Sequence, residues 1–573
     1  MIAKMTQYSF ILLHGDKEAF LSELQQLGVM DITRSTKPVD SFSQSLLDNI
    51  ATLRNDIDCT IKGSDPTLVE LEAGRDAILD EIAEVTPWGE YDRERLSPFG
   101  IHYYAVATKK FDPAWEEKYA LQVVGSEDGL TWFVIVGDNA GFPLKELPAP
   151  QHTPSELAPI LEDQEDKIAL HRAILEERKG NLPKMEKHLR NMQADLDRYL
   201  AGVAAVPAAE DTIDTLVGFA PSENDEAVTA FLDQSGVFYL KDEAKVQENP
   251  PIKFKNNKFV KMFEVLTDMY GRPAYDGFDP TPFISVFFLL FFALCMGDAG
   301  YGLVLILVGL LLRKVDSFKD MAPLVVTLGA GTVVVGFFLH TFFSIDIAQW
   351  KVFEPIKGIF LPDEIGGYAG GMVLAIIIGI VHLCLAMVVK AIQEVKVKGF
   401  AGSLGTLGWT LLIVGGVIVG AFALTGVLDA KLTKWIIIVI GVISALGIFP
   451  FNNPDRNKLA NVGLGLWDTY NTATGLLGDV LSYLRLYALG LAGSMLGMAF
   501  NDMGKMVLGD GHSWVLWIPF ILLVLVGHTL NIAMCALGAF VHPLRLNFLE
   551  FFKNSGYEAT GRNYNPLKKQ TNK

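Results

Sequence analysis

Arg485 stands out among the residues that could do chemistry. It lies in GDVLSYLRLYALGLAGS, residues 478–494, within a long apolar stretch. Arginine keeps its charge in proteins, and at the centre of a bilayer it costs about 2.5–3.5 kcal/mol even on a lenient scale. On a helix its face is mostly small, with Gly478, Ser482 and Ala488, so another helix can approach closely. The pattern predicts an arginine that meets a carboxylate on a partner helix; the alternative is an arginine that snorkels from the end of a span.

A second basic residue, Arg545, lies in FVHPLRLNFLEFF, residues 540–552. On a helix it shares a face with Asn531, and His542 precedes it by about one turn. Two interpretations remain open, because Arg545 is also close enough to the end of the last span to anchor it at the interface. Glu550 is either part of a funnel for ions or only an interfacial charge.

Further ionisable residues lie in or beside apolar segments, and such groups mark ion pathways by default. Asp479 is six residues from Arg485 and therefore faces another side of the helix. Asp298, in the turn GDAGYG, is expected to cap the following helix rather than to carry ions. For the histidines, a buried structural role and a role in proton relay both remain open. These histidines are His528, His382 and His340.

The composition divides the chain of 573 residues into two halves. Residues 1–260 are rich in charge and contain no apolar run near the ~20 residues that span a bilayer. Residues 281–550 hold almost all the long apolar runs. The formal net charge of −17 excludes a nucleic-acid partner, because phosphate binding needs a basic surface. The four cysteines are scattered and predict neither a disulfide framework nor a zinc site.

We predict eight apolar spans in an all-α polytopic membrane domain. The last two are too long for a simple crossing, which predicts tilt or projection beyond the lipid. The spans are 281–297, 298–313, 321–343, 367–390, 404–427, 433–450, 462–500 and 513–548.

The orientation of these spans follows from the loops. The N-terminus, MIAKMTQYSF, lacks the layout of a signal peptide, so we expect the first half in the cytoplasm. The loops 313–319, 390–398 and 455–458 then face the same side, and all carry Lys or Arg. This bias predicts a multi-pass protein of the cell membrane with both termini in the cytoplasm.

The first half alternates predicted strands with amphipathic helices and polar helices. Strands are expected at 8–15, 29–35, 101–109, 120–125, 131–138, 215–221 and 237–242. Two polar helices are expected within 41–86 and a longer one at 154–202, with a possible kink at Pro183. They predict an antiparallel helical stalk; the alternative is unrelated helices packed on the α/β lobes.

The fold class is therefore an α+β arm, two α/β lobes joined by a helical stalk, followed by eight transmembrane helices. The arm occupies 1–260, with lobes at about 1–38 with 215–245 and at 88–150. The stalk is formed by about 39–87 and 154–205, a junction by 261–280, the membrane domain by 281–550 and a cytoplasmic tail by 551–573. The chain contains neither a P-loop nor a GxGxxG motif after a strand, so no nucleotide or other cofactor is expected.

Four segments together resemble the a/I subunit of V-type and A-type rotary ATPases. They are SYLRLYALGLA (482–492), FVHPLRLNFLEFF (540–552), FFALCMGDAGYG (291–302) and the junction 249–283. The resemblance covers the whole architecture, and the short chain with its brief outer loops is typical of a prokaryotic member.

The resemblance implies a non-catalytic stator subunit that translocates H⁺ or Na⁺. In the family, two half-channels meet a rotating proteolipid (c/K) ring on either side of an arginine, and Arg485 matches that arginine. Arg545 matches the second arginine, and His542 and Glu550 match its neighbours. The partners implied are the ring, peripheral stalk subunits (E/G type) at the lobes, a central stalk cap subunit (d/C type) and the lipid bilayer.

One position departs from the eukaryotic pattern. A glutamate is expected about ten residues before the second arginine, but Cys535 stands there. The external half-channel must then use other groups, such as His528, Asn531 or His382.

The alternative function is a self-contained secondary ion transporter with a cytoplasmic regulatory domain. Such transporters are expected to have repeated halves with broken helices; spans one to four and five to eight lack such a repeat. A purely structural anchor has no need of a buried charge.

Overall fold

The structure is a computed structural model that describes residues 1–34, 39–127, 129–208, 212–315, 318–362, 364–449, 458–509 and 514–569. By its internal contacts the chain divides into two compact units. One comprises Met1–Phe10 and Val217–Pro566, and the other comprises Ile11–Leu216 and Leu567–Lys573. Residues 316–317 and 455–457 of the predicted basic loops lie outside the described residues.

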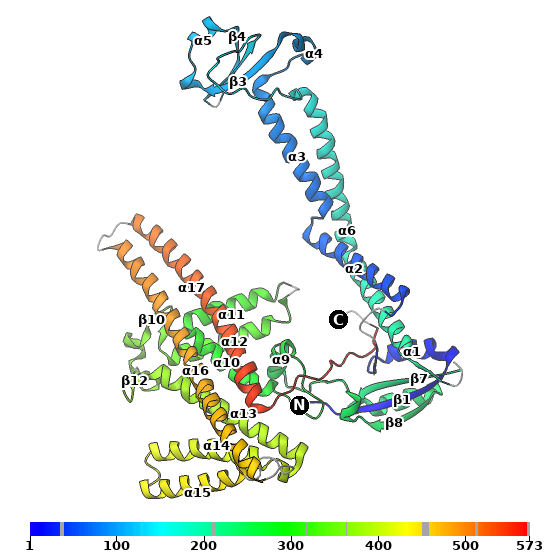
Figure 1. Ribbon diagram of the computed structural model, residues 1–573, viewed down its shortest axis with the longest axis vertical. Coiled ribbons are helices and arrows are strands. Elements are labelled where there is room, and N and C mark those ends of the chain that lie inside the picture. Colours follow the sequence, from blue (N-terminus) through cyan, green and yellow to red (C-terminus); the bar gives the residue numbers. More distant parts are fainter. Residues whose placement is uncertain are drawn as a thin grey trace. The chain divides into compact units, whose positions relative to one another are not determined.

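The second unit contains a helical hairpin of polar helices. α2 (Ser41–Lys62) and α3 (Pro66–Val85) both pack against α6 (Pro154–Val203), as Figure 1 shows. Two small apolar clusters form the seam: Ile50 with Leu196 and Leu200, and Leu68 with Ile168 and Leu175. The contact between the two helical regions overturns the alternative of unrelated helices. α6 continues through Pro183 as one helix of 50 residues.

Asp65 both begins α3 and ties it to α6. Its carboxylate accepts a hydrogen bond from the Leu68 N–H at 2.7 Å, which caps the helix. The other oxygen lies 2.9 Å from His171 Nε2 on α6. Burial works against the charge, but the Leu68 N–H and His171 outweigh it and hold the pKa of Asp65 below its ordinary value.

The same unit carries an antiparallel sheet of three strands in the order β3-β5-β4. The strands are β3 (Ile101–Ala107), β4 (Leu121–Glu127) and β5 (Leu130–Val136), close to the predicted segments. Alternate residues of β3 and β5 are buried, as expected of a sheet with one covered face. Aromatic rings from α5 (Ala114–Lys118) and the following loops complete the core beneath Phe133.

A second sheet has the strand order β2-β7-β1-β8, with β6 (Val206–Ala208) paired to β7. Its strands are β1 (Met5–Leu13), β2 (Asp31–Ile32), β7 (Ile213–Pro221) and β8 (Phe238–Glu243). The helices α1 (Lys17–Leu27) and α7 (Asp225–Ser235) follow β1 and β7. β2 is shorter than the predicted strand 29–35, whose last residue lies outside the described residues. Just before β2, the carbonyl of Met30 accepts a hydrogen bond from the Leu567 N–H at 2.8 Å.

The C-terminal part is helical, and five of its described helices are long and apolar enough to cross a membrane. They are α13 (Gly370–Gly402), α14 (Leu404–Leu424), α15 (Ala430–Ile448), α16 (Lys458–Leu508) and the segment Trp514–Ser555 that contains α17 (Trp517–Arg545). Three apolar helices are shorter: α10 (Thr281–Met296), α11 (Ala299–Leu312) and α12 (Ala322–Phe338). An α/β N-terminal region followed by a helical C-terminal part is thus confirmed.

Short elements fill the connections. They are α4 (Arg93–Leu96), α8 (Lys258–Lys261), α9 (Glu264–Tyr270), α18 (Phe552–Ser555), β9 (Thr341–Phe342), β10 (Ile345–Asp346), β11 (Glu364–Ile365) and β12 (Tyr368–Ala369). α12 ends five residues before the predicted limit of its span. It ends there because His340, Phe343 and Ser344 have positive φ angles of 48°, 47° and 58°, which no α-helix accommodates.

The apolar helices pack as neighbouring pairs, and α10 lies against α12, α16 and α17. α11 packs on α12, α14 on α15 and α16 on α17, and α13 lies against α16. Phenylalanines of α10, among them Phe288 and Phe291, form the centre of the core. α16 has 51 residues and therefore measures about 76 Å, well beyond the ~30 Å of a hydrocarbon core.

Truncation of Leu175, which is 2% exposed in the hairpin seam, tests the packing of α3 on α6. We expect Leu175→Ala to lower the local unfolding free energy of the hairpin by about 2–5 kcal/mol, because it leaves a cavity. Hydrogen–deuterium exchange on the full chain in detergent measures this. The matched control is Leu170→Ala, since Leu170 is 65% exposed on the same helix. Equal exchange in the two variants contradicts the packing.

Candidate functional site

Arg485 is a half-buried cation with an unused donor. Its Nη1 atom is buried and has no hydrogen-bond partner within the residues that the structure describes. In the same part of the chain, no carboxylate forms an ion pair with it. Gly478, two turns earlier on the same face, faces open space, and Ala488 is exposed. Because the side chain is only half buried and has no ion-pair partner among the described residues, a carboxylate from another chain can approach its charge from the open face.

Exposed apolar residues surround both arginines on the paired helices α16 and α17. On α16 the stripe that contains Arg485 also contains Leu477, Leu481 and Met495, which are between 55% and 64% exposed. On α17 the stripe that ends at Arg545 contains Met534, Leu537 and Val541, which are between 48% and 68% exposed. Exposed apolar stripes of this size face lipid or another protein.

Arg545 is the last residue of α17 and is exposed. Its guanidinium and that of Arg485 both lie within electrostatic reach of His542. The Nδ1 atom of His542 is buried and has no hydrogen-bond partner among the described residues. The structure therefore brings these three residues to one place between α16 and α17.

Glu550 lies in a π-helical segment, Leu546–Phe551, that follows α17 directly. Its side chain is buried, and its Oε2 atom lacks a hydrogen-bond partner in the described part of the chain. The Oδ1 atom of Asn547 is unpartnered in the same way, although its Nδ2 donates to Pro543 O. Buried unsatisfied oxygens are costly unless water or an ion reaches them. π-helical segments of this kind are frequent at functional sites.

Asp479 lies one and a half turns before Arg485 and faces a polar cavity of about 350 Å³. One carboxylate oxygen accepts a hydrogen bond from Asn554 Nδ2 at 2.8 Å, and the other lies 3.5 Å from Lys553 Nζ. Lys390 of α13 and Asn471 of α16 also line the cavity. The hydroxyl of Ser482 donates to Gly478 O at 3.1 Å.

His528 and Asn531 of α17 belong to a second polar group, which lies beside the part of α16 that follows Arg485. Asn531 Nδ2 donates to Tyr301 OH and to Gly493 O, at 2.8 and 2.9 Å. Tyr301 OH lies 2.8 Å from His528 Nδ1, and His528 Nε2 lies 2.9 Å from Asn501 Oδ1. Because the amide oxygen of Asn501 can only accept, the proton of the neutral imidazole is on Nε2, and Nδ1 accepts from Tyr301 OH. The result is one directed chain of hydrogen bonds across three helices.

Asp298 holds the elements that support this chain. It is the N-cap of α11 and accepts from the N–H groups of Gly300 and Tyr301 at 2.8 and 3.1 Å. The same carboxylate accepts from Phe343 N at 2.9 Å and from Ser344 N at 2.6 Å. Both of these residues have the left-handed backbone described above, so Asp298 stabilises a strained loop. Phe343 O in turn accepts from Asn501 Nδ2 at 2.8 Å.

A small cavity of about 220 Å³ borders α16 beyond Arg485. Tyr487 and Ser494 of α16 line it together with His340 of the strained loop and Gly371 of α13. Polar groups thus border α16 on both sides of Arg485 along the helix.

The predicted site residues therefore fall into two groups. Arg485, Arg545, His542, Glu550, Asp479 and Ser482 lie around the middle of α16 and the end of α17. His528 and Asn531 lie in the second group, which Tyr301 connects to the Asp298 cap. Sequence reasoning missed Tyr301 and Asn501. Tyr301 is part of the quoted GDAGYG turn, but nothing in the sequence signals Asn501.

A sequence model described as the V-type ATPase 116 kDa subunit family matches residues 166–321 and 473–569. The chain is similar to this family over these two regions. The first matched region contains Asp298 and Tyr301, and the second contains Arg485, Arg545 and their neighbours. The residues of both polar groups therefore lie within the segments that the family shares.

Individual relatives carry names consistent with the family. The chain is 29% identical to the A-type ATP synthase subunit I of Methanocaldococcus jannaschii over 73% of its own length and 64% of that protein. It is 31% identical to the protein of the same name from Pyrococcus abyssi over 61% of its length and 53% of that protein. It thus spans less than two thirds of these archaeal relatives. It is 23% identical to the V-type ATP synthase subunit I of Borreliella burgdorferi over 99% of its length and the whole of that protein.

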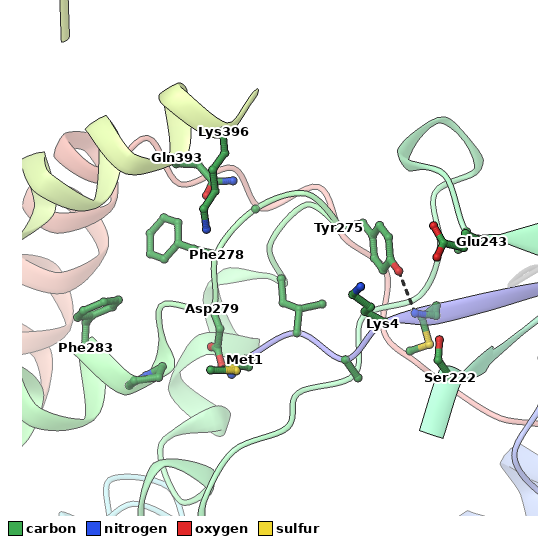
Figure 2. A pocket seen from close by; sticks show the side chains of 16 residues that line it. Met1, Lys4, Ser222, Glu243, Tyr275, Phe278, Asp279, Phe283, Gln393 and Lys396 are labelled. Atoms are coloured by element: carbon green, nitrogen blue, oxygen red, sulfur yellow. Dashed lines mark hydrogen bonds and ion pairs between the residues drawn. The ribbon is translucent and has the colours of Figure 1, made fainter. Parts of the chain in front are cut away.

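Neither polar group lines the cavity of about 720 Å³ at the junction segment. Figure 2 shows that cavity between the chain's first residues, the loop 275–283 and the end of α13. Tyr275 OH accepts a hydrogen bond from Met5 N at 2.8 Å, and Asp279 lies 2.6 Å from the amine of Met1. Asp279 also accepts from Thr281 N at the start of α10. These contacts connect β1 to the first apolar helix, so we interpret this cavity as part of the junction.

Substitution of Asp298 tests its supporting role. In Asp298→Asn the amide group must turn a donor toward at least one of four backbone N–H groups. We expect a loss of about 2–3 kcal/mol of stability. A lower midpoint of thermal unfolding of the chain in detergent measures it. The control is Asp502→Asn, since the Asp502 side chain is 61% exposed on α16. A midpoint equal to that of the control contradicts the role.

Proposed function

We propose that the chain is the membrane stator subunit I of a V/A-type rotary ATPase or ATP synthase, which couples H⁺ or Na⁺ translocation to rotation of a proteolipid ring. The observation that carries the proposal is the half-buried cation of Arg485, which has no ion-pair partner among the described residues and shares a face of α16 with Gly478, where the space is open. The names of its relatives support it, since they are subunit I of A-type or V-type ATP synthases.

Arg485 separates two ion paths by electrostatics. A carboxylate that faces lipid is costly when ionised, so a ring carboxylate must bind an ion before it leaves the stator. Opposite Arg485 the same carboxylate stays ionised, because the guanidinium supplies a charge-assisted hydrogen bond. The fixed positive charge also repels a cation that would cross directly between the two paths. The exposed stripes of α16 and α17 are the surface on which the ring turns.

The group around Asp479 and Glu550 forms the cytoplasmic half-channel. Three features support this role: the polar cavity of about 350 Å³, the buried unpartnered oxygen of Glu550 and the unpartnered nitrogen of His542. Water or an ion satisfies such atoms. Ser482 and Arg545 complete the wall of this path.

The external half-channel lies beside the part of α16 that follows Arg485. His528 and Asn531 supply its polar groups, and Tyr301 and Asn501 extend them in one directed chain. The cavity of about 220 Å³ beside Ser494 supports access from that side. These groups take the role of the glutamate that the eukaryotic pattern has at the position of Cys535.

We propose that the three shorter apolar helices cross the membrane together with the five longer ones, and that both termini lie in the cytoplasm, as an even number of spans allows. The α/β region then forms a cytoplasmic arm, in which two lobes joined by the α2–α3–α6 hairpin hold peripheral stalk subunits and face the central stalk cap. The chain itself is not an enzyme; ATP is hydrolysed or made on other subunits. Lipid surrounds the remaining faces.

Loss of the arginine is the decisive test. We expect Arg485→Ala to abolish ATP-driven ion transport in vesicles that contain the whole complex, while ring, stalk and ATPase subunits still co-purify. Arg485→Lys is also expected to fail, because lysine lacks the planar fork that pairs with a carboxylate. Transport is measured with and without Na⁺ and with a protonophore, which also identifies the ion.

The control is Arg313→Ala, since Arg313 is exposed at the end of α11. We expect normal transport in that variant. Coupled transport at the normal rate in Arg485→Ala refutes the assignment. Purification without a proteolipid ring favours a secondary transporter instead.

A further inference from the structure

Tyr483, two residues before Arg485, packs tightly against α13. Its side chain is fully buried, and its ring lies directly on Gly379. A methyl group at position 379 would overlap that ring, so only glycine leaves room for it. Tyr487, one turn later, repeats the contact at Gly371, where a methyl group would lie 3.0 Å from the ring. Two notches on α13 therefore receive two successive tyrosines of α16.

The hydroxyl of Tyr483 is also fixed, by a hydrogen bond to α13. It lies 2.9 Å from Nδ1 of His382, which stands one turn after Gly379 on the same face of α13. His382 is 0% exposed. A buried hydrogen bond at the end of a buried ring fixes both the position and the rotation of the tyrosine.

The imidazole of His382 also connects α16 to the segment that carries Glu550. It stacks on Phe551, which follows Glu550 directly, with ring centres 4.8 Å apart and planes inclined by 7°. On its other side it contacts Phe287 of α10, with ring centres 4.2 Å apart. One ring thus joins α10, α13, α16 and the π-helical segment.

Residues two apart on an α-helix point in directions about 200° apart. When Tyr483 is fixed toward α13, Arg485 must point to the opposite side, which is the open face of α16. We propose that Gly379, His382 and Tyr483 form a lock that sets the rotation of α16 and thereby aims Arg485 at the ring. This inference rests on the proposed function and makes these three positioning residues, which act through α16 and not on the ion.

The surroundings of His382 argue against the alternative of an ion or proton carrier. Four aromatic rings enclose it: Phe287, Phe291, Tyr483 and Phe551. Its Nε2 atom has no hydrogen-bond partner within the described residues, and the apolar rings of Phe287, Phe291 and Phe551 around it supply none that could continue a relay. A relay residue needs a partner on each side.

Filling the notch tests the lock in the whole complex. In Gly379→Ala the tyrosine ring must shift, and we expect ATP-driven transport in vesicles to fall by about tenfold or more, because small misplacements of reacting groups are costly. ATP hydrolysis by the same preparation is expected to continue, so that hydrolysis and transport become uncoupled. The matched control is Gly416→Ala on α14, where a methyl group meets open space; we expect its transport to be normal.

Two substitutions at His382 separate positioning from relay. His382→Asn keeps a polar group close to the place of Nδ1 and is expected to retain most of the transport. His382→Phe leaves the tyrosine hydroxyl without a partner and is expected to lose it. Equal loss in both variants overturns the positioning role. If Gly379→Ala fails to assemble, this pair decides the question alone.

Arg485→Ala, measured alongside, distinguishes the two proposals. If that variant transports ions normally, the proposed function fails. If it is inactive while Gly379→Ala and His382→Phe both transport like the Gly416→Ala control, only the lock is refuted.

Discussion

The permanent charge of Arg485 is the constraint on which the rest of the membrane region depends. A guanidinium cannot be neutralised by losing its proton, so an apolar helix that carries one needs a partner or water for each donor. Within the described residues the chain leaves one buried donor of Arg485 unused. The same face of α16 carries Gly478, which meets open space, and the exposed Ala488. The half-buried side chain thus keeps its charge close to a surface, where a passing carboxylate can approach it.

Close helix packing holds this charge in a defined direction. α16 and α17 approach each other at glycines: a methyl group on Gly493 would lie 2.5 Å from the sulfur of Cys535, and one on Gly527 equally close to the ring of Phe500. On its other side, α16 presses Tyr483 and Tyr487 into the notches of α13. Such interfaces are rigid because backbones and rings, unlike flexible side chains, have little room to yield. Rigidity at Arg485 and exposure of the stripes around it are therefore two results of the same packing.

The two polar groups along α16 and α17 differ in how well they are satisfied. Around His528 both ring nitrogens have partners, and Asp298 anchors the group through the backbone of Phe343; the Ser344 hydroxyl in the same loop has none among the described residues. Around Glu550, Asn547 and His542, single atoms remain without partners among the described residues. A complete network favours a fixed conformation, whereas unmatched buried atoms favour water or ions. The π-helical turn after Pro543 adds to this difference, because it removes regular backbone pairing where Glu550 lies.

Much of the architecture was predictable from the sequence, because it follows from local chemistry. Apolar length indicated the five helices that are long enough to cross a membrane, the polar segments 41–86 and 154–202 indicated the helices of the hairpin, and the short turn GDAGYG indicated Asp298 at a helix start. The end of α12 was not predictable, because it depends on left-handed residues that a distant carboxylate stabilises. Tertiary structure alone brought Asn501 to His528, Tyr483 to Gly379 and His382 to Phe551, since these pairs are 27, 104 and 169 residues apart along the chain. The sequence by itself determined that a charge must be accommodated in the membrane helices; the packing of helices distant in sequence decided where that charge points.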